Sequence, residues 1–345
     1  MSDPLLPRRD FLKSAGTLGA VAAGPLSVAG LPATNTLGAT PLLGAASENT
    51  KFPKLAIITP YSPQKLKFAA ATGYEGVVIP MEGDFQPEKL SDRQIDEIAA
   101  TAKEADVQII SLECMFGFNH ISKDLKERQK ARSSFLRALE LAHRLGCKFV
   151  GTFSGGMSGA SADTQIKEFA AVINESYLPA CEKLDLRIGH ENYPCEVNFA
   201  TVPALWEKLL TLVPNHRYGL EFDPSHLVRQ FIDPIQTAWD FRDRICGVHA
   251  KDTEIIQPVL QKVGIHGDGW WRYRIPGQGL IDWPKFFTVL LQIGFQGGVA
   301  VEHEDDFWDD KPLNEAEFPQ ARKNGFILAS RFLRQYLPGR LDSRG

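Results

Sequence analysis

Short runs of apolar and β-branched residues alternate with longer helical patterns from residue 54 to near the end of the chain. Eight of these runs are predicted strands: residues 55–59, 76–80, 107–112, 148–153, 186–191, 218–223, 245–250 and 298–302. Helices are predicted between them, among others at residues 91–104, 125–145, 164–184 and 284–293. Gly73, Gly146 and Gly294 follow or end helical patterns, as C-terminal glycines do. This alternation is typical of parallel βα units and not of a sandwich.

Eight strands in about 290 residues match the eight βα units of a (β/α)8 or TIM barrel. We therefore predict an α/β fold of this class for residues 52–340. The alternative is a doubly wound open sheet, which carries a glycine-rich phosphate turn after its first strand. Here Ile58 is followed by Thr-Pro-Tyr-Ser-Pro, so that turn is missing.

Composition narrows the class of protein further. The chain has 345 residues, of which 43% are hydrophobic and 23% charged, so it can bury a large core. Its net charge is -4 and no run of Lys or Arg follows the first dozen residues, which excludes nucleic acid as the main partner. The cysteines form no C-x-x-C pair and their odd number does not describe a disulfide framework: Cys114, Cys147, Cys181, Cys195 and Cys246.

The amino-terminal segment reads as an export signal. Residues 14–47 are 34 consecutive positions without Asp, Glu, Lys or Arg, but Pro25, Pro32 and Pro41 argue against a membrane span. The preceding Arg8-Arg9-Asp10-Phe11-Leu12-Lys13 resembles the twin-arginine motif. We predict a signal peptide and linker over residues 1–47, recognition of the precursor by the twin-arginine machinery, and a periplasmic or otherwise exported protein. A disordered leader and an uncleaved anchor are the alternatives.

Candidate chemistry gathers where four successive predicted strands end. In a parallel barrel the functional side chains stand at the carboxyl ends of the strands. These ends read His190-Glu191-Asn192, Asp223-Pro-Ser-His226, His249-Ala-Lys251-Asp252 and Glu302-His-Glu304-Asp305. Small residues stand two positions before three of the site residues, on the same face of each strand, and are expected to leave space beneath the site: Gly189, Gly247 and Ala300. Glu221, two before Asp223, breaks this pattern and is either a supporting carboxylate or a sign that the register is off by one.

Glutamate, aspartate and histidine side chains that converge from four strands suit Mn²⁺, Mg²⁺, Co²⁺ or Zn²⁺. Two glutamates on opposite sides of such a metal could each take or return a proton beside a sugar carbonyl, while the metal holds the enediolate charge.

These segments resemble the sugar isomerases and epimerases of the xylose isomerase-like TIM barrel superfamily, which also includes inosose dehydratase and D-tagatose 3-epimerase-type enzymes. The resemblance is strongest at residues 188–194, 222–227, 248–252, 275–283 and 301–305. It implies that Glu191, Asp223, His249 and Glu302 are metal ligands, with Glu191 and Glu302 also the catalytic acid/base pair.

Five further residues are predicted to bind the substrate. His226 resembles the histidine that contacts substrate or a second metal in relatives, and Lys251 shares the face of His249, with a salt bridge to Asp252 or Glu304 as its alternative role. Trp271 and Arg274 belong to segment 266–274, predicted as a substrate lid or as ordinary loop packing. His120 is the weakest candidate.

We therefore expect a metal-dependent isomerase or epimerase acting on a small-molecule sugar or keto-sugar. The alternative is a lyase or dehydratase that eliminates water or an aglycone from a keto-inositol or 3-keto-glycoside through the same enolate. A non-catalytic sugar-binding barrel is a third hypothesis. The sequence leaves open whether the protein is a monomer or a homo-oligomer. No anion site is evident at a strand end, where Arg272 and Arg274 are the only nearby pair, so an unphosphorylated sugar is expected.

Overall fold

The predicted barrel is confirmed in the computed structural model of the protein, which describes residues 52–309 and 315–338. Eight parallel strands close in the order β1-β10-β7-β6-β5-β4-β3-β2. Their bounds are β1 Lys54–Ile58, β2 Gly76–Pro80, β3 Gln108–Cys114, β4 Phe149–Thr152, β5 Arg187–Glu191, β6 Tyr218–Phe222, β7 Ile245–Ala250 and β10 Gly298–Val301. The predicted export signal lies outside the described residues. Among those described, no helix combines the length and apolarity that crossing a membrane requires.

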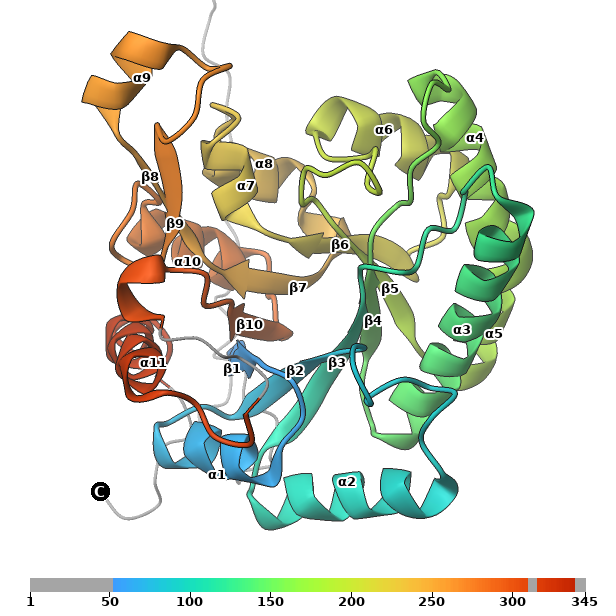
Figure 1. Ribbon diagram of the computed structural model, residues 1–345, viewed down its shortest axis with the longest axis horizontal. Helices are drawn as coiled ribbons and strands as arrows, with labels where there is room; N and C mark the ends of the chain where they lie inside the picture. The colour runs from blue at the N-terminus through green and yellow to red at the C-terminus, as the bar shows by residue number, and fades with distance from the viewer. Residues whose placement is uncertain (1–51, 310–314, 339–345) are drawn as a thin grey trace, which may run out of the picture. The chain divides into compact units, whose positions relative to one another are not determined.

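Helices follow the strands along the chain and surround the barrel (Figure 1). They are α1 Pro63–Ala71, α2 Asp92–Glu104, α3 Leu125–Arg144, α4 Ala162–Val172, α5 Leu178–Leu184, α6 Pro203–Leu212, α7 Pro224–Val228, α8 Pro234–Asp240, α10 Trp283–Gln292 and α11 Gln320–Leu333. The predicted helix at 164–184 is interrupted by a π-helical turn over Ile173–Tyr177. Pro179 is the second residue after this turn, and a wider turn accommodates a ring that has no N–H to donate.

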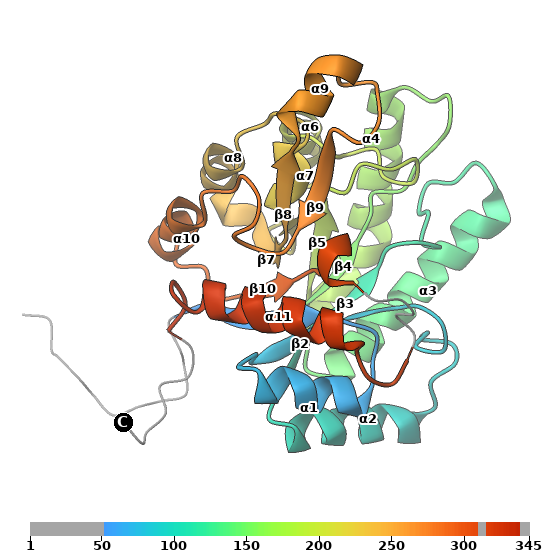
Figure 2. The same ribbon diagram turned by 60° about the vertical axis from the view of Figure 1, so that its left-hand side comes forward.

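One excursion departs from the βα pattern. After β7 the chain forms a two-stranded antiparallel sheet of β8 (Asp252–Ile255) and β9 (Trp271–Arg274), with α9 (Gln257–Val263) between them. Residues 271–274 of segment 266–274, which was predicted as a substrate lid or as loop packing, are therefore a strand of this hairpin. Figures 1 and 2 both show it projecting beyond the barrel beside α7. The hairpin thus stands at the carboxyl ends of the strands.

The space predicted beneath the site is filled by one ring. Phe149, in β4, belongs to a buried cluster inside the barrel together with Ile58, Val78 and Ile110. A Cβ atom on Gly247 would lie 2.4 Å from the Phe149 ring, and one on Gly189 would lie 3.0 Å from it. The two glycines are therefore small because they admit this ring, which forms a packed floor under the barrel mouth.

Glu221 has its own glycine. A Cβ atom on Gly151, in β4, would lie 2.0 Å from Oε2 of Glu221. The side chain of Glu221 consequently points into the barrel, where it is 1% exposed. The predicted register of the sixth strand was correct, and Glu221 is a buried inward-facing carboxylate.

We predict that Gly247→Ala lowers the free energy of unfolding by about 1–3 kcal/mol, because its new methyl group overlaps the Phe149 ring. Urea denaturation measures the change. In the double variant Gly247→Ala/Phe149→Leu the costs of the two substitutions should sum to more than the observed loss. Strictly additive costs would show that the ring and the glycine do not constrain each other.

Candidate functional site

The four predicted ligand residues meet at the mouth of the barrel. Glu191 ends β5, Asp223 directly follows β6, His249 lies in β7 and Glu302 directly follows β10. One ligand atom from each of them lies within 4.8 Å of all the others. The first three side chains are buried and that of Glu302 is 22% exposed. The cluster is thus closed below and accessible from one side.

His249 divides the cluster into two layers. Its Nδ1 faces the mouth, 3.3 Å from Oε1 of Glu191 and 3.1 Å from Oε2 of Glu302. Its Nε2 faces the barrel interior, 3.2 Å from Oε1 of Glu113 and 3.3 Å from Oε1 of Glu221. A histidine that binds a metal through one ring nitrogen commonly offers its other N–H to a carboxylate. Two buried carboxylates are in place for that contact.

Glu113, the penultimate residue of β3, was missed in the sequence. The predicted third strand ended at residue 112, one residue short of it, whereas the structure extends β3 to Cys114. The signal was an acidic residue at the carboxyl end of an otherwise apolar run. Its direction could not be inferred, because side chains that alternate along a strand face the interior or the helices.

Asp223 is held so that one carboxylate oxygen points into the cluster. It is the N-cap of α7, where Oδ1 accepts a hydrogen bond of 2.7 Å from the backbone N–H of Ser225. Asn192 also accepts from the backbone N–H of Asp223 and donates to its carbonyl, each at 2.9 Å. Oδ2 accepts no hydrogen bond from the described residues. That oxygen lies 3.2 Å from the Nζ of Lys251.

Lys251 is a buried cation in contact with the cluster. Its Nζ lies 2.6 Å from Oε2 of Glu302 and 2.8 Å from Oε2 of Glu304. The ring of Tyr273 lies 4.4 Å from the same nitrogen. Of the two salt bridges considered for Lys251, the one to Glu304 forms in the structure. Lys251 therefore links the cluster to β9.

Asp252, the other salt-bridge partner considered for Lys251, instead accepts hydrogen bonds from the chain around it. Its carboxylate accepts hydrogen bonds from the backbone N–H groups of Thr253, Gly277 and Ile281, and from the indole of Trp283. A Cβ atom on Gly279 would lie 2.2 Å from Oδ1 of Asp252. Segment 275–283, one of those that carry the family resemblance, thus wraps around this carboxylate and holds the end of β7.

Tyr273 brings the hairpin into the site. Its hydroxyl lies 2.9 Å from Nδ1 of His226, whose Nε2 is 3.1 Å from Oδ2 of Asp223 and 3.4 Å from Oε1 of Glu191. The predicted residue His226 is therefore at the cluster. Tyr273 was not singled out from the sequence, because four aromatic and cationic side chains alternate in β9 and their directions depend on its pairing with β8.

The other three predicted substrate-binding residues do not contact the cluster. Trp271 packs on the guanidinium of Arg229 at 4.5 Å. Arg274 forms ion pairs with Glu254 at 2.7 Å and Asp305 at 2.9 Å. His120 is fully buried between Tyr177 and Thr152, each 2.8 Å from one of its ring nitrogens, and burial lowers its pKa to about 3. In the structure these side chains make internal contacts.

Burial and mutual repulsion set the protonation of the carboxylates. Burial raises the pKa of Glu191 to about 7, with repulsion from Glu302 in the same direction and His249 opposing it. Burial, together with the negative charge of Glu221, likewise raises the pKa of Glu113 to about 7. Burial also acts to raise the pKa of Glu302, but attraction to Lys251 and His249 outweighs it and lowers that pKa. The cluster thus carries more acid groups than its two cations can keep ionised.

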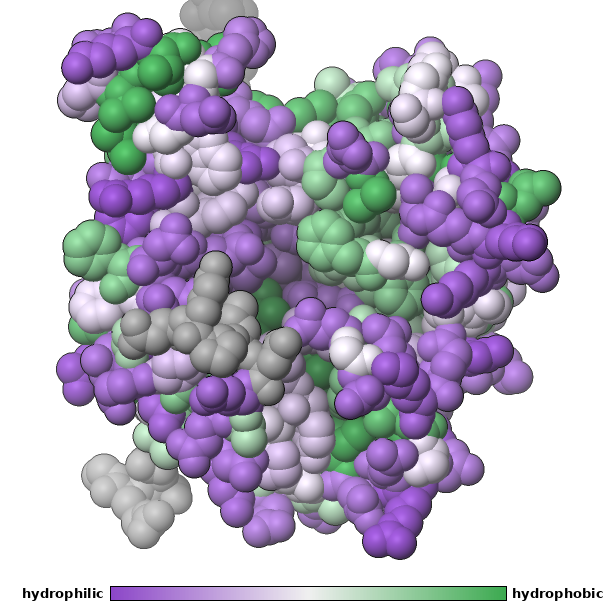
Figure 3. Space-filling model, in the orientation of Figure 1, coloured by the Kyte–Doolittle hydropathy of each residue, from purple (hydrophilic) through white to green (hydrophobic). Residues whose placement is uncertain are grey.

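A cavity of about 370 Å³ opens above the cluster and is lined by Glu191, His249 and Glu302. Aromatic side chains form part of its wall: the rings of Phe153 and Tyr193 stack with centroids 5.8 Å apart, and Phe116 meets Phe153 edge-on at 5.3 Å. The face shown in Figure 3 is hollowed near its centre, with hydrophilic surface inside the hollow and a hydrophobic patch beside it. A polar floor beside an aromatic wall is typical of a small-molecule site.

A closed parallel barrel with a carboxylate and imidazole cluster at its mouth defines the class of the protein as a TIM-barrel protein with a potential metal site. The chain belongs to the xylose isomerase-like TIM barrel family, whose profile matches residues 66–334. The expected family is thereby confirmed.

Individual curated relatives match part of the chain. The chain is 32% identical over 106 residues to inosose dehydratase from Clostridium beijerinckii, a match that covers 29% of this chain and 35% of the relative. The chain spans about a third of the length of the curated relatives that it matches first.

Solved structures are similar in fold. D-allulose 3-epimerase from Methylomonas sp. superposes with a TM-score of 0.64 at 15% identity, covering 84% of this chain and 99% of that chain. A structure of the IolI protein with a bound zinc atom gives 0.60 at 22% identity, covering 82% and 96%. Epimerases and dehydratases thus stand side by side among the proteins that this chain resembles, and the solved structures show the shared fold.

The raised pKa values predict how stability depends on pH when no metal is present. Glu113 and Glu191 bind protons more tightly in the folded chain, at about 7, than at the ordinary 4.5. At these two sites the folded state holds more protons between these pH values, so their contribution to the free energy of unfolding should rise as the pH falls from 8 to 5.5. His249, whose pKa is also raised by its carboxylate neighbours, acts in the same direction. Buried histidines whose pKa is lowered, His120 and His190 among them, contribute in the opposite direction.

Urea denaturation of metal-free protein across this pH range measures the effect. Glu302 does not change the trend, because its lowered pKa keeps it ionised throughout. As the pH falls from 8 to 5.5, the difference in free energy of unfolding between the wild type and the double variant Glu113→Gln/Glu191→Gln should move in favour of the wild type. The difference from Glu140→Gln, on the exposed surface of α3, should stay constant. A difference from the double variant that does not change with pH, or that moves the other way, would contradict the assigned protonation.

Proposed function

We propose that the protein is a metal-dependent sugar or keto-sugar isomerase or epimerase that moves a proton between carbons next to a carbonyl. The observation that carries the proposal is the convergence of Glu191, Asp223, His249 and Glu302, whose ligand atoms lie within 4.8 Å of one another at the barrel mouth. Fold alone does not supply this argument, since one barrel hosts many activities.

The residues fit a divalent cation. Three carboxylates and one imidazole are the donors that Mn²⁺, Mg²⁺, Co²⁺ and Zn²⁺ accept, and Oδ2 of Asp223 points into the cluster, where Lys251 and His226 are its neighbours. Glu113 and Glu221 stand where they can orient the imidazole of His249. A cation bound by this set would polarise a substrate carbonyl and offset the negative charge that develops on its oxygen.

Glu191 and Glu302 occupy the two sides of the cluster. Around the barrel β5 and β10 are separated by β6 and β7, so their carboxylates approach a sugar in the cavity from different directions. One carboxylate takes the proton from the carbon next to the carbonyl, and the other returns a proton to the adjacent carbon or to the opposite face. Lys251 keeps Glu302 ionised and in place through the contact of 2.6 Å.

The cavity supports a monosaccharide ring as the reacting unit. Its volume of about 370 Å³ lies at the lower end of the range for small-molecule sites. The stacked Phe153 and Tyr193 offer an apolar surface to the C–H face of a pyranose, and the charged cluster faces the hydroxyls.

A lyase or dehydratase is the second candidate, and the match to inosose dehydratase favours it. Proton removal beside the carbonyl is common to both reactions. In the elimination the electron pair of the broken C–H bond forms a C=C bond, and the β-substituent leaves with a proton as water or as an aglycone. The same two glutamates would serve as the base and the acid.

Incubation in D₂O separates these reactions. The Mn²⁺-loaded protein is incubated with a ketohexose, a keto-inositol or a 3-keto-glucoside. The substrate should incorporate deuterium at the carbon next to its carbonyl, which NMR and mass spectrometry detect. Exchange without loss of water or aglycone indicates isomerisation, and release of either indicates elimination.

We expect Glu191→Gln and Glu302→Gln each to slow the exchange by about 10²–10⁴-fold, because each removes a proton-transfer group. The exposed Glu140→Gln variant is the matched control and should exchange at the wild-type rate. Undiminished exchange in both site variants would contradict the catalytic role of Glu191 and Glu302. Failure of the wild-type protein to retain Mn²⁺ would contradict the proposed metal dependence.

A further inference from the structure

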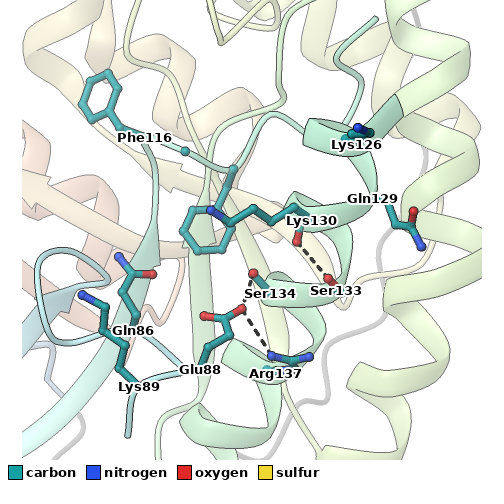
Figure 4. A pocket seen from close by; sticks show the side chains of 12 residues that line it. Gln86, Glu88, Lys89, Phe116, Lys126, Gln129, Lys130, Ser133, Ser134 and Arg137 are labelled. Atoms are coloured by element: carbon teal, nitrogen blue, oxygen red, sulfur yellow. Dashed lines mark hydrogen bonds and ion pairs between the residues drawn. The ribbon is translucent and has the colours of Figure 1, made fainter. Parts of the chain in front are cut away.

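A second depression adjoins the sugar cavity. A groove of about 650 Å³ runs between the segment that follows β2 and helix α3. Gln86, Glu88 and Lys89 line it from the first side, and Lys126, Lys130 and Arg137 of α3 line it from the second (Figure 4). None of these residues belongs to the cluster at the barrel mouth.

The groove concentrates positive charge on an acidic protein. Lys89, Lys126, Lys130 and Arg137 line it, against the single acidic lining residue Glu88. Lys89 is paired outside the groove lining, with Asp84 at 3.2 Å. Glu88 is itself engaged, since it accepts a hydrogen bond from Ser134 and lies 3.7 Å from Arg137. No ion pair joins Lys126 or Lys130 to a carboxylate within residues 52–309 and 315–338. The whole chain, by contrast, has a net charge of -4.

Lys126 and Lys130 lie on the same face of α3. They are four residues apart, so they lie one helical turn from each other on the same side. Both side chains are exposed, and Figure 4 shows Lys130 extending across the groove. Two like charges held side by side in a concave surface attract an anion more strongly than either alone.

Phe116 connects the groove with the sugar cavity, because it lines both. Its side chain is 68% exposed although its ring contacts Phe153 and Tyr193 of the cavity wall. An exposed aromatic ring at such a junction offers a stacking surface to the unit next to the one in the cavity. A ligand can therefore extend from the cluster, over Phe116, toward the two lysines.

We propose that the groove is a second subsite, which binds the anionic second unit of a glycoside whose sugar occupies the cavity. The proposal rests on the proposed function, since it places the reacting sugar at the cluster. It also accounts for the missing anion site at the strand ends: the negative group is recognised on α3, away from the reacting carbons. The substrate class would be an acidic glycoside instead of a free sugar or a sugar phosphate.

A matched pair of probes tests the subsite by direct binding. Phenyl β-D-glucopyranoside and 4-carboxyphenyl β-D-glucopyranoside share the sugar and the ring and differ in one carboxylate. Isothermal titration of the Mn²⁺-loaded full chain gives the affinity of each. We expect the carboxylated probe to bind about tenfold more tightly at low ionic strength, and the ratio to shrink in about 0.5 M NaCl.

Charge variants locate the effect. Lys126→Gln/Lys130→Gln should bring the affinity ratio of the two probes close to one. Lys183→Gln/Lys262→Gln removes two exposed lysines of α5 and α9, outside the groove, and should keep the wild-type ratio. Equal affinities for the two probes in the wild-type protein overturn the proposal, as does an equal loss in both double variants or no binding of the carboxylated probe.

The outcome can be told apart from that of the proposed reaction. A probe ratio that depends on Lys126 and Lys130 while keto-sugars show no metal-dependent deuterium exchange supports the subsite and rejects the reaction. Exchange without a probe ratio supports the reaction and rejects the subsite.

Discussion

Excess negative charge buried at one end of the barrel is the constraint on which the rest of the structure depends. Six carboxyl groups surround His249 and Lys251: Glu113, Glu191, Glu221, Asp223, Glu302 and Glu304. In a low-dielectric interior their repulsion is large, and two protein cations cannot offset it. The site is therefore neutralised either by protons, which the raised pKa values of Glu113 and Glu191 reflect, or by a bound cation. Ligand binding and proton binding are alternatives at the same oxygens.

Such a cluster needs a rigid frame, and structural contacts outside the cluster provide it. Asn192 joins the ends of β5 and β6 through paired hydrogen bonds with the backbone of Asp223. Asp252 gathers backbone N–H groups of the segment after β9 and so anchors the end of β7. Phe149 closes the barrel beneath His249 because Gly189 and Gly247 leave room for its ring. These contacts hold side chains from separate strands against their mutual repulsion.

Two parts of the fold surround the cluster. The strands carry the polar side chains at its floor, whereas the segments that follow the strands form the outer wall of the cavity. The β8–β9 hairpin contributes Tyr273, which contacts both His226 and Lys251. The segment after β3 contributes Phe116, placed between the cavity and the basic groove on α3. Specificity in barrels of this kind resides in such segments, and here two of them flank the cluster at the barrel mouth.

The sequence by itself determined the number of the barrel strands and their order along the chain, because alternating β-branched runs and helical patterns are local signals. It also placed Glu191, Asp223, His249 and Glu302 at strand ends, since closure of a parallel barrel brings all such ends to one mouth. What only the tertiary structure decided are contacts between segments distant in the chain. The inward direction of Glu113, the reach of Tyr273 to His226 and the internal contacts of His120, Trp271 and Arg274 depend on how each segment packs against others. Periodicity tells which residues end a strand, but the direction and partner of a buried side chain follow from packing in three dimensions.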